Sequence, residues 1–152
     1  MSKKVFRIRL SCEVPGHYQE VMEAFDRNLF EALAPAYPPM EVERFTGSKT
    51  GDEVALTFKG PLPMKWVSMI TDHGSDSEKA FFIDRGVVLP FGLTYWKHHH
   101  IVEKIDAYHS RIIDDMFFSG KNKWHGALLY PALYLAFSAR KPKYLKYFRS
   151  KR

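Results

Sequence analysis

Residues 93–118 read LTYWKHHHIVEKIDAYHSRIIDDMFF, and they hold the strongest indication of the fold. Two runs rich in β-branched and aromatic residues, 93–105 and 109–118, flank a short polar segment around Ala107. This pattern is typical of two antiparallel strands joined by a turn. Three consecutive histidines lie in the first run, where successive side chains point to opposite faces of a sheet. The stretch therefore predicts a hairpin with histidines on both of its faces.

The segment before this hairpin predicts five more strands. Residues 3–14, KKVFRIRLSCEV, alternate apolar and polar side chains, as a half-buried strand does. Shorter runs of strand-forming residues follow, each bounded by turns rich in Gly, Pro, Ser or Asp. These runs cover residues 40–45, 53–59, 64–71 and 79–88. With the hairpin, the predicted sheet has seven strands.

Two short helices are predicted between the first strand and the second. Apolar side chains recur at helical spacing over residues 17–34, and Asp26–Asn28 offer capping side chains in the middle of that stretch. The prolines of residues 35–39 end the second helix, because proline cannot continue one.

A long helix is predicted after the last strand. Ser119 and Asn122 are its candidate caps, and Pro131 and Pro142 are expected to kink it or to start new segments. The order of one strand, two helices, six strands and a long helix predicts an α+β fold with one antiparallel sheet. Because the long helix is apolar around much of its circumference, we expect a cavity between it and a curved sheet.

The composition fits one cytoplasmic domain over residues 1–152. A chain of 152 residues has the usual size of a single domain. The N-terminal residues lack an apolar run long enough for a signal peptide, and no stretch approaches the roughly 20 apolar residues that span a bilayer. The single cysteine, Cys12, excludes an internal disulfide framework and agrees with a reducing compartment.

Positive charge is concentrated near the C-terminus. The net charge is +6, and residues 116–152 carry nine Lys and Arg with no Asp or Glu, which leaves −3 for residues 1–115. Within this basic region, residues 140–152 predict either a weak contact with an anionic membrane surface or the solvated face of a terminal helix. The chain has no nucleic-acid-binding motif, so no nucleic-acid partner is expected.

The order and spacing of several short motifs resemble those of the START-like, or SRPBCC, superfamily. The motifs are Pro15, Tyr37-Pro38, Gly51-Asp52, Pro90-Phe91, Trp96 with His98 and His100, Asp114, and Phe137 with Arg140. The likeness covers nearly the whole chain and is closest to bacterial members of unassigned role. Two departures are Leu89, where Gly usually precedes Pro-Phe, and Pro131, which interrupts the last helix. The resemblance implies a helix-grip fold with a deep apolar pocket between the sheet and the C-terminal helix, as in Bet v 1-like and polyketide cyclase-like proteins.

Aromatic and polar residues of the predicted strands are candidates for the wall of this pocket. The expected ligand-binding residues are Phe58, Trp66, Ser68, Trp96, His98, His100, Asp114, Met116 and Phe118. The expected ligand is a hydrophobic or amphipathic small molecule, such as a lipid, a polyketide or an isoprenoid-like compound, and no cofactor is expected. Any one of the aromatic residues can equally fill the core, so the case for a cavity depends on the fold.

His98 and His100 share one face of their strand, whereas His99 lies on the other. In a hairpin that turns near Ala107, His100 lies about opposite Asp114. Such a pair can be structural, can orient a ligand or act as a catalytic base, or can begin a two-histidine, one-carboxylate metal site. His100 and Asp114 are therefore the candidate catalytic residues. A metal site is not expected, because it needs a third ligand that converges on both histidines.

Three functions remain open at this point. The first is binding of an apolar or amphipathic small molecule in the pocket. The second is an enzyme of the cyclase or dehydrase type, in which the His100–Asp114 pair moves a proton. The third is a peripheral membrane module that uses residues 140–152.

Overall fold

Seven antiparallel strands form one sheet in the computed structural model, which describes residues 4–35 and 38–151. The strands are β1 (Phe6–Pro15), β2 (Met40–Phe45), β3 (Glu53–Phe58), β4 (Met64–Ser75), β5 (Lys79–Val88), β6 (Tyr95–Lys104) and β7 (His109–Ser119). Their order across the sheet is β1-β7-β6-β5-β4-β3-β2, so β1 and β2 form the edges. The hairpin predicted from residues 93–118 is β6 and β7.

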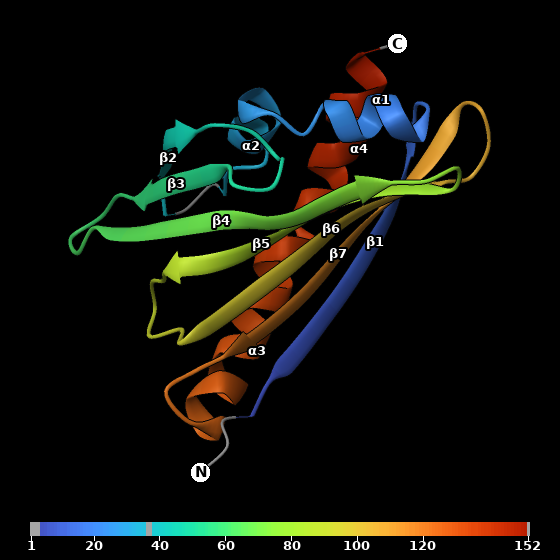
Figure 1. Ribbon diagram of the computed structural model, residues 1–152. Coiled ribbons are helices and arrows are strands. Elements are labelled where there is room, and N and C mark those ends of the chain that lie inside the picture. The colour runs from blue at the N-terminus through green and yellow to red at the C-terminus, as the bar shows by residue number, and fades with distance from the viewer. Residues whose placement is uncertain (1–3, 36–37, 152) are drawn as a thin grey trace.

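The described residues form four helices, which lie on one side of this sheet (Figure 1). They are α1 (Tyr18–Glu23), α2 (Arg27–Ala32), α3 (Lys123–Ser138) and α4 (Arg140–Ser150). Figure 1 shows α3 and α4 running behind the sheet along its length, with α1 and α2 across the end at which α4 lies. The predicted helix-grip fold is confirmed, with its two short helices between β1 and β2 and its long, bent C-terminal helix.

Two of the predicted helix caps are confirmed and one is wrong. Oδ1 of Asp26 accepts from the backbone N–H of Leu29 at the start of α2, at 3.0 Å. Oδ1 of Asn122 accepts from the N–H of His125 at the start of α3, at 2.9 Å. Ser119 instead ends β7, and its hydroxyl donates to the carbonyl of Lys4. Each true cap satisfies a backbone N–H that the first helical turn leaves without a partner.

The two prolines of the last helix behave differently. Pro142 has no N–H to offer the carbonyl of Ser138, and the helix is interrupted at Ala139, between α3 and α4. In contrast, α3 continues through Pro131, so no new segment starts there. The expected long helix is therefore two helices joined at one residue.

The predicted strand boundaries hold to within a few residues, with one clear exception. β4 continues to Ser75, beyond the predicted end at residue 71. The turn that follows it is tight, because Oδ1 of Asp76 accepts from the N–H groups of Glu78 and Lys79 at 2.8 and 3.0 Å. Lys3, where the first strand was predicted to begin, and the motif residue Tyr37 lie outside the described residues.

The core consists of two clusters on the helix side of the sheet. The first lies under α1, α2 and α4 and includes Phe25, Leu29, Phe82, Tyr144 and Phe148. The second lies under α3 and includes Ile8, Trp96, Met116, Phe118 and Leu133. The aromatic residues of α4 thus pack in the core, as the alternative interpretation of the basic tail expected.

Candidate functional site

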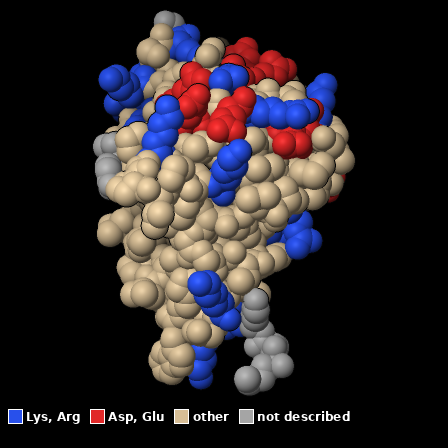
Figure 2. All heavy atoms as spheres, turned by 90° about the vertical axis from the view of Figure 1, so that its left-hand side faces the viewer, with Lys and Arg blue, Asp and Glu red and all other residues tan. Residues whose placement is uncertain are grey.

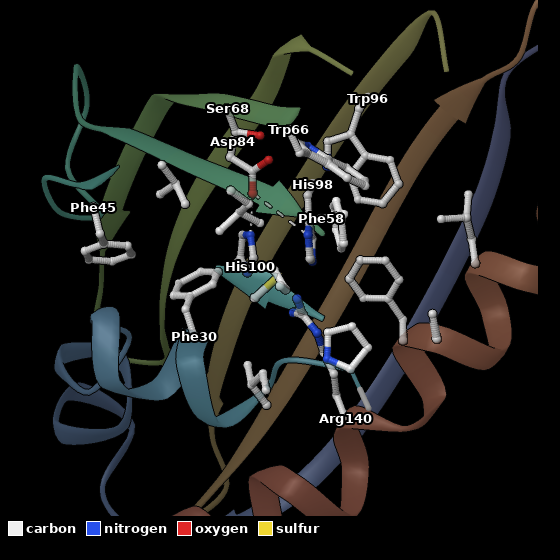
Figure 3. Close-up of a pocket in the computed structure, with 18 of the residues that line it drawn as sticks. Phe30, Phe45, Phe58, Trp66, Ser68, Asp84, Trp96, His98, His100 and Arg140 are labelled. Carbon is white, nitrogen blue, oxygen red and sulfur yellow. Dashed lines mark hydrogen bonds and ion pairs between the residues drawn. The ribbon is translucent and has the colours of Figure 1, made fainter. Parts of the chain in front are cut away.

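A cavity of about 410 Å³ lies between the sheet and α3. Strands β2 to β6 and helices α2 and α3 supply its walls, and the first residue of α4 closes one side. Most of the lining is apolar or aromatic, as is usual for a site that binds a small organic molecule. Figure 3 shows Asp84 and Ser68 on one side of His98 and His100, with Arg140 reaching toward the two imidazoles from the helix.

Six of the nine predicted ligand-binding residues line this cavity. They are Phe58, Trp66, Ser68, Trp96, His98 and His100. The other three, Asp114, Met116 and Phe118, lie on β7 and are not part of its wall. Met116 and Phe118 have no exposed surface, because α3 and β1 cover that part of β7. Contact of the six lining residues with a ligand stays a prediction.

Asp84 and Arg140 are polar residues of the site that the sequence analysis did not predict. Asp84 follows Ala80 and Phe82 on the buried face of β5, and a charged residue in an alternating apolar series was the available signal. Arg140 was noted in the family motif but was assigned to the basic tail. Its side chain lines the cavity and is 18% exposed.

The two histidines and two aspartates form crossed pairs. The register places His100 opposite Asp114 and His98 opposite Asp84. The hydrogen bonds run diagonally, since Nε2 of His98 donates to Asp114 at 2.8 Å and Nε2 of His100 donates to Asp84 at 2.6 Å. The predicted placement of His100 opposite Asp114 is therefore confirmed. Nδ1 of His100 and Oδ1 of Asp114 are 3.9 Å apart, which is too long for a hydrogen bond. Asp84 on β5, the other neighbour of β6, accepts the hydrogen bond from His100 instead.

The two imidazole rings are stacked. Their centroids are 3.6 Å apart and their planes differ by 25°. Burial, and after it the charge of His100, lower the pKa of His98 to about 4, against the opposing effect of the hydrogen bond to Asp114. At neutral pH the His98 ring is therefore uncharged, with Nε2 as the donor and with Nδ1 as an acceptor that makes no hydrogen bond among the described residues.

Both carboxylates remain ionised in this buried site. Burial raises the pKa of Asp114, but the hydrogen bond from His98 and the charge of Arg140 outweigh it, so that the pKa lies below its usual value. The same balance, with His100 as the first donor, lowers the pKa of Asp84. Burial and the charge of Asp114 raise the pKa of Tyr144, whose hydroxyl donates to Asp114 at 3.1 Å. Asp114 thus accepts hydrogen bonds from His98 and Tyr144 and forms an ion pair with Arg140.

Asp84, His98 and His100 are also close enough to be considered as metal ligands, with one candidate atom from each within 4.8 Å of the others. An imidazole binds a metal along a lone pair in its ring plane, at about 2.0–2.1 Å for zinc. Two nearly parallel rings stacked at 3.6 Å have planes that do not meet at that distance from both nitrogens. The rings would have to rotate out of their hydrogen bonds, so this arrangement fits hydrogen bonding better than chelation.

The basic tail, residues 140–152, has both buried and exposed side chains in α4. Tyr144 and Phe148 are buried, and Nζ of Lys143 donates to the carbonyl of Ala34 at 2.6 Å. Lys146 and Arg149 are exposed. No helix in residues 4–35 and 38–151 is long and apolar enough to cross a bilayer.

Figure 2 shows the side of the molecule on which β2 and β3 lie. Charged side chains gather in the upper part of this face, with both signs intermixed, and the middle of the face has few of them. Nucleic acids are bound by surfaces of one, positive sign. The described residues on this face form no such surface.

Comparison with known proteins supports the fold. No family model and no curated protein matches the chain. Among solved structures, an aromatase/cyclase from a Streptomyces species has a TM-score of 0.72 at 11% identity over 96% of this chain and 94% of its own. Norcoclaurine synthase from Thalictrum flavum, in complex with dopamine and hydroxybenzaldehyde, has a TM-score of 0.64 at 16% identity over 91% and 84%. The allergen Ara h 8.0201 has a TM-score of 0.54 at 15% identity over 79% and 81%.

These three structures are all of the Bet v 1-like, or SRPBCC, fold class. The chain therefore has the helix-grip fold that the motifs indicated. At these levels of identity the likeness concerns the fold.

Proposed function

We propose that the protein binds an apolar or amphipathic small molecule, such as a lipid, a polyketide or an isoprenoid-like compound, in the cavity between the sheet and α3. The cavity itself carries this proposal: about 410 Å³ of space, walled by aromatic side chains, with polar groups gathered on one side. Apolar burial supplies affinity at about 25 cal/mol for each Å² removed from water, and the polar groups supply orientation. A cytoplasmic location for one domain of residues 1–152 belongs to the same proposal.

Native mass spectrometry of protein purified gently from its own host tests this function. We expect a bound lipophilic mass that is released and identified after denaturation. Ala136, which lines the cavity, gives a blocked variant, Ala136→Phe, and Ala127→Phe on the exposed side of α3 gives its matched control. Retention of the ligand mass by the control and its loss from the blocked variant would place the ligand in this cavity. Wild-type protein that binds nothing from its host or from a lipophilic library would count against the proposal.

A second candidate function, an enzyme of the cyclase or dehydrase type, is favoured by the two buried His–Asp pairs. A histidine hydrogen-bonded to a carboxylate can take a proton from a substrate that fills the cavity. The pairs that the structure offers are His98–Asp114 and His100–Asp84. Both histidines line the cavity, and neither Nδ1 makes a hydrogen bond among the described residues. Because Nδ1 of His100 is buried, we assign the role of base to His98.

Exchange of the α-protons of a ketone in D₂O, followed by NMR, tests this second function without knowledge of the substrate. Methyl naphthyl ketone is a suitable probe, because its aromatic body suits the cavity wall. We expect exchange faster than in buffer with wild-type protein, and loss of that acceleration with His98→Gln at ketone affinity within a few-fold of wild type. Equal exchange with and without protein would remove this function for ketone substrates.

Contact of residues 140–152 with an anionic membrane surface is kept as an additional proposal. Lys146, Arg149 and Lys151 are exposed on the last helix and its end, whereas Tyr144 and Phe148 of the same helix are buried. Replacing all three by Gln tests this contact and leaves the core intact. Equal sedimentation of wild type and variant with phosphatidylglycerol vesicles would contradict it.

A further inference from the structure

Arg140 occupies a distinctive place in the fold. It is the first residue of α4, directly after the interruption at Ala139, and its side chain lines the cavity. The guanidinium lies over the ring of Phe137 at 4.5 Å from the centroid, in a cation–π contact. Figure 3 shows it pointing toward His98 and His100 from the helix side.

The guanidinium has a hydrogen-bond donor that the described part of the protein does not use. Nη1 of Arg140 is buried and makes no hydrogen bond among the described residues. Its distance to Oδ1 of Asp114 is 3.8 Å, which is an ion pair but too long for a hydrogen bond. That carboxylate already accepts from His98 at 2.8 Å and from Tyr144 at 3.1 Å. A buried donor without an acceptor is costly, so an acceptor on a ligand would be favoured at this point.

The charges around this donor decide which acceptor suits it. Asp114 already balances the charge of Arg140, and Asp84 is a second ionised carboxylate in the same cluster. The His98 ring beside them is uncharged at neutral pH. An anionic head group would add a third negative charge to a buried region, whereas a carbonyl oxygen adds none.

We propose that the ligand carries an uncharged carbonyl oxygen that accepts a hydrogen bond from the guanidinium of Arg140. The apolar body of the ligand then lies along Phe137 and Trp96, whose rings are stacked at 5.6 Å and line the same cavity. This inference rests on the proposed binding function and names the class of compound that the cavity takes.

Three probes with one aromatic body test it by isothermal titration calorimetry. They are methyl naphthyl ketone, ethylnaphthalene, which lacks the acceptor, and naphthoate, which is an anion. A hydrogen bond to a charged group predicts that the ketone binds wild-type protein roughly tenfold or more tighter than ethylnaphthalene. Naphthoate is expected to bind no tighter than the ketone, because Asp84 and Asp114 repel it.

Arg140→Met keeps the apolar stem of the side chain and removes the donor. We expect this variant to bind the ketone and ethylnaphthalene equally, with ethylnaphthalene affinity close to that of wild type. Lys146→Met, an exposed cation on the same helix, is the matched control and should keep the full preference. If the single variant does not fold because Asp114 loses its cation, Arg140→Met combined with Asp114→Asn removes both charges together and must show the same loss.

The outcomes separate this inference from the function on which it rests. Binding of the ketone and ethylnaphthalene to wild-type protein with equal affinity would overturn the inference and leave the binding function standing. Tighter binding of naphthoate than of the ketone would overturn the choice of an uncharged acceptor. If no probe binds wild-type protein, the binding function fails for compounds of this size and the inference fails with it.

Discussion

His98 and His100 are stacked rings, each bonded to the aspartate that lies diagonally across from it. Because the ring centroids are 3.6 Å apart, two positive charges would lie in contact if both imidazoles were in the protonated, cationic form. The carboxylates of Asp84 and Asp114 hold the orientation of the rings and thereby decide which nitrogen of each ring faces the cavity.

The free energy of unfolding is expected to fall as the pH decreases from 6.5 to 4. Unfolded His98 binds a proton below its ordinary pKa of 6.5, whereas the folded form binds one only below about 4, so the unfolded state holds more protons between these values. The loss reaches about 3 kcal/mol at the lower end. Below pH 3.8 Asp114 adds a further loss, because its pKa is lowered in the folded state and only the unfolded state takes up the proton there.

Urea unfolding at a series of pH values checks this expectation. His98→Gln keeps a donor for Asp114 but cannot take up a proton, so its pH dependence between 6.5 and 4 should be flatter. His109→Gln, at an exposed histidine, is the control and should follow wild type. A His98→Gln variant with the full wild-type slope would show that another group titrates in this range.

Asp114 and Tyr144 are expected to differ in what their removal costs. Asp114→Ala leaves His98 and Arg140 without their buried carboxylate and should cost about 3–5 kcal/mol of unfolding free energy. Tyr144→Phe removes one hydrogen bond, 3.1 Å long, and should cost about 1 kcal/mol. Denaturant unfolding at pH 7 measures both, and equal costs would contradict the central place given to the carboxylate.

Sequence reasoning found part of this cluster for a clear reason. The period of two on a strand placed His98 and His100 on one face, and the turn near Ala107 placed Asp114 opposite His100. It missed Asp84, because the register between β5 and β6 depends on the whole sheet. The diagonal direction of the hydrogen bonds depends on how side chains lean, which a register does not state.

At the level of elements, the close approach of α3 to β1 depends on Gly126. A Cβ at this position would overlap the ring of Phe6, which is stacked on Phe118 and held there. We expect Gly126→Ala to lower the free energy of unfolding by about 1–3 kcal/mol, although Ala is the better helix former.

The neighbouring position provides the reverse change as a control. Ala127 is exposed on α3, and Ala127→Gly should cost about 1 kcal/mol through helix propensity alone. Thermal or urea unfolding measures both variants. A stabilising effect of Gly126→Ala would mean that the helix moves away from Phe6 at little cost.

The same reasoning applies to α4, which looks from its composition like a basic tail. Phe148 is 4% exposed and belongs to the core, so Phe148→Ala should cost about 3–5 kcal/mol. Lys146→Ala, two positions earlier and exposed, should change stability by less than about 0.5 kcal/mol. Urea unfolding measures both variants. If Phe148→Ala changed the free energy of unfolding as little as Lys146→Ala, α4 would behave as a surface tail and not as part of the core.

For the whole molecule, a bound ligand is expected to raise thermal stability by mass action. A ligand at 100 times its Kd adds about 2.7 kcal/mol to the free energy of unfolding if it binds the folded state alone. Differential scanning calorimetry with methyl naphthyl ketone should show this increase for wild type and for Ala127→Phe, and its loss for Ala136→Phe. An equal shift for all three proteins would place the ketone outside the cavity.

The order of elements was predictable because each strand and helix has its own period and its own turn residues. The hairpin of β6 and β7 and the two short helices show this clearly. The cavity was predictable from the likeness to a fold and from no single residue. Its wall was predictable only in part, because Met116 and Phe118 share a sheet face with His98 yet lie where α3 packs directly on β7.

The position of β1 has a consequence for how the chain folds. β1 pairs with β7 alone, with Phe6 opposite Phe118. β1, the first strand of the sheet in sequence, therefore cannot pair until β7, the last strand, has been synthesised. The other pairings join strands that are neighbours in sequence and can form as hairpins while the chain grows. We therefore expect an early, incomplete sheet in which β7 is an unpaired edge strand. In that state α3 and α4 lack part of the sheet surface on which they pack in the folded protein. Until β1 arrives, that exposed edge is the place where newly made molecules are most open to aggregation.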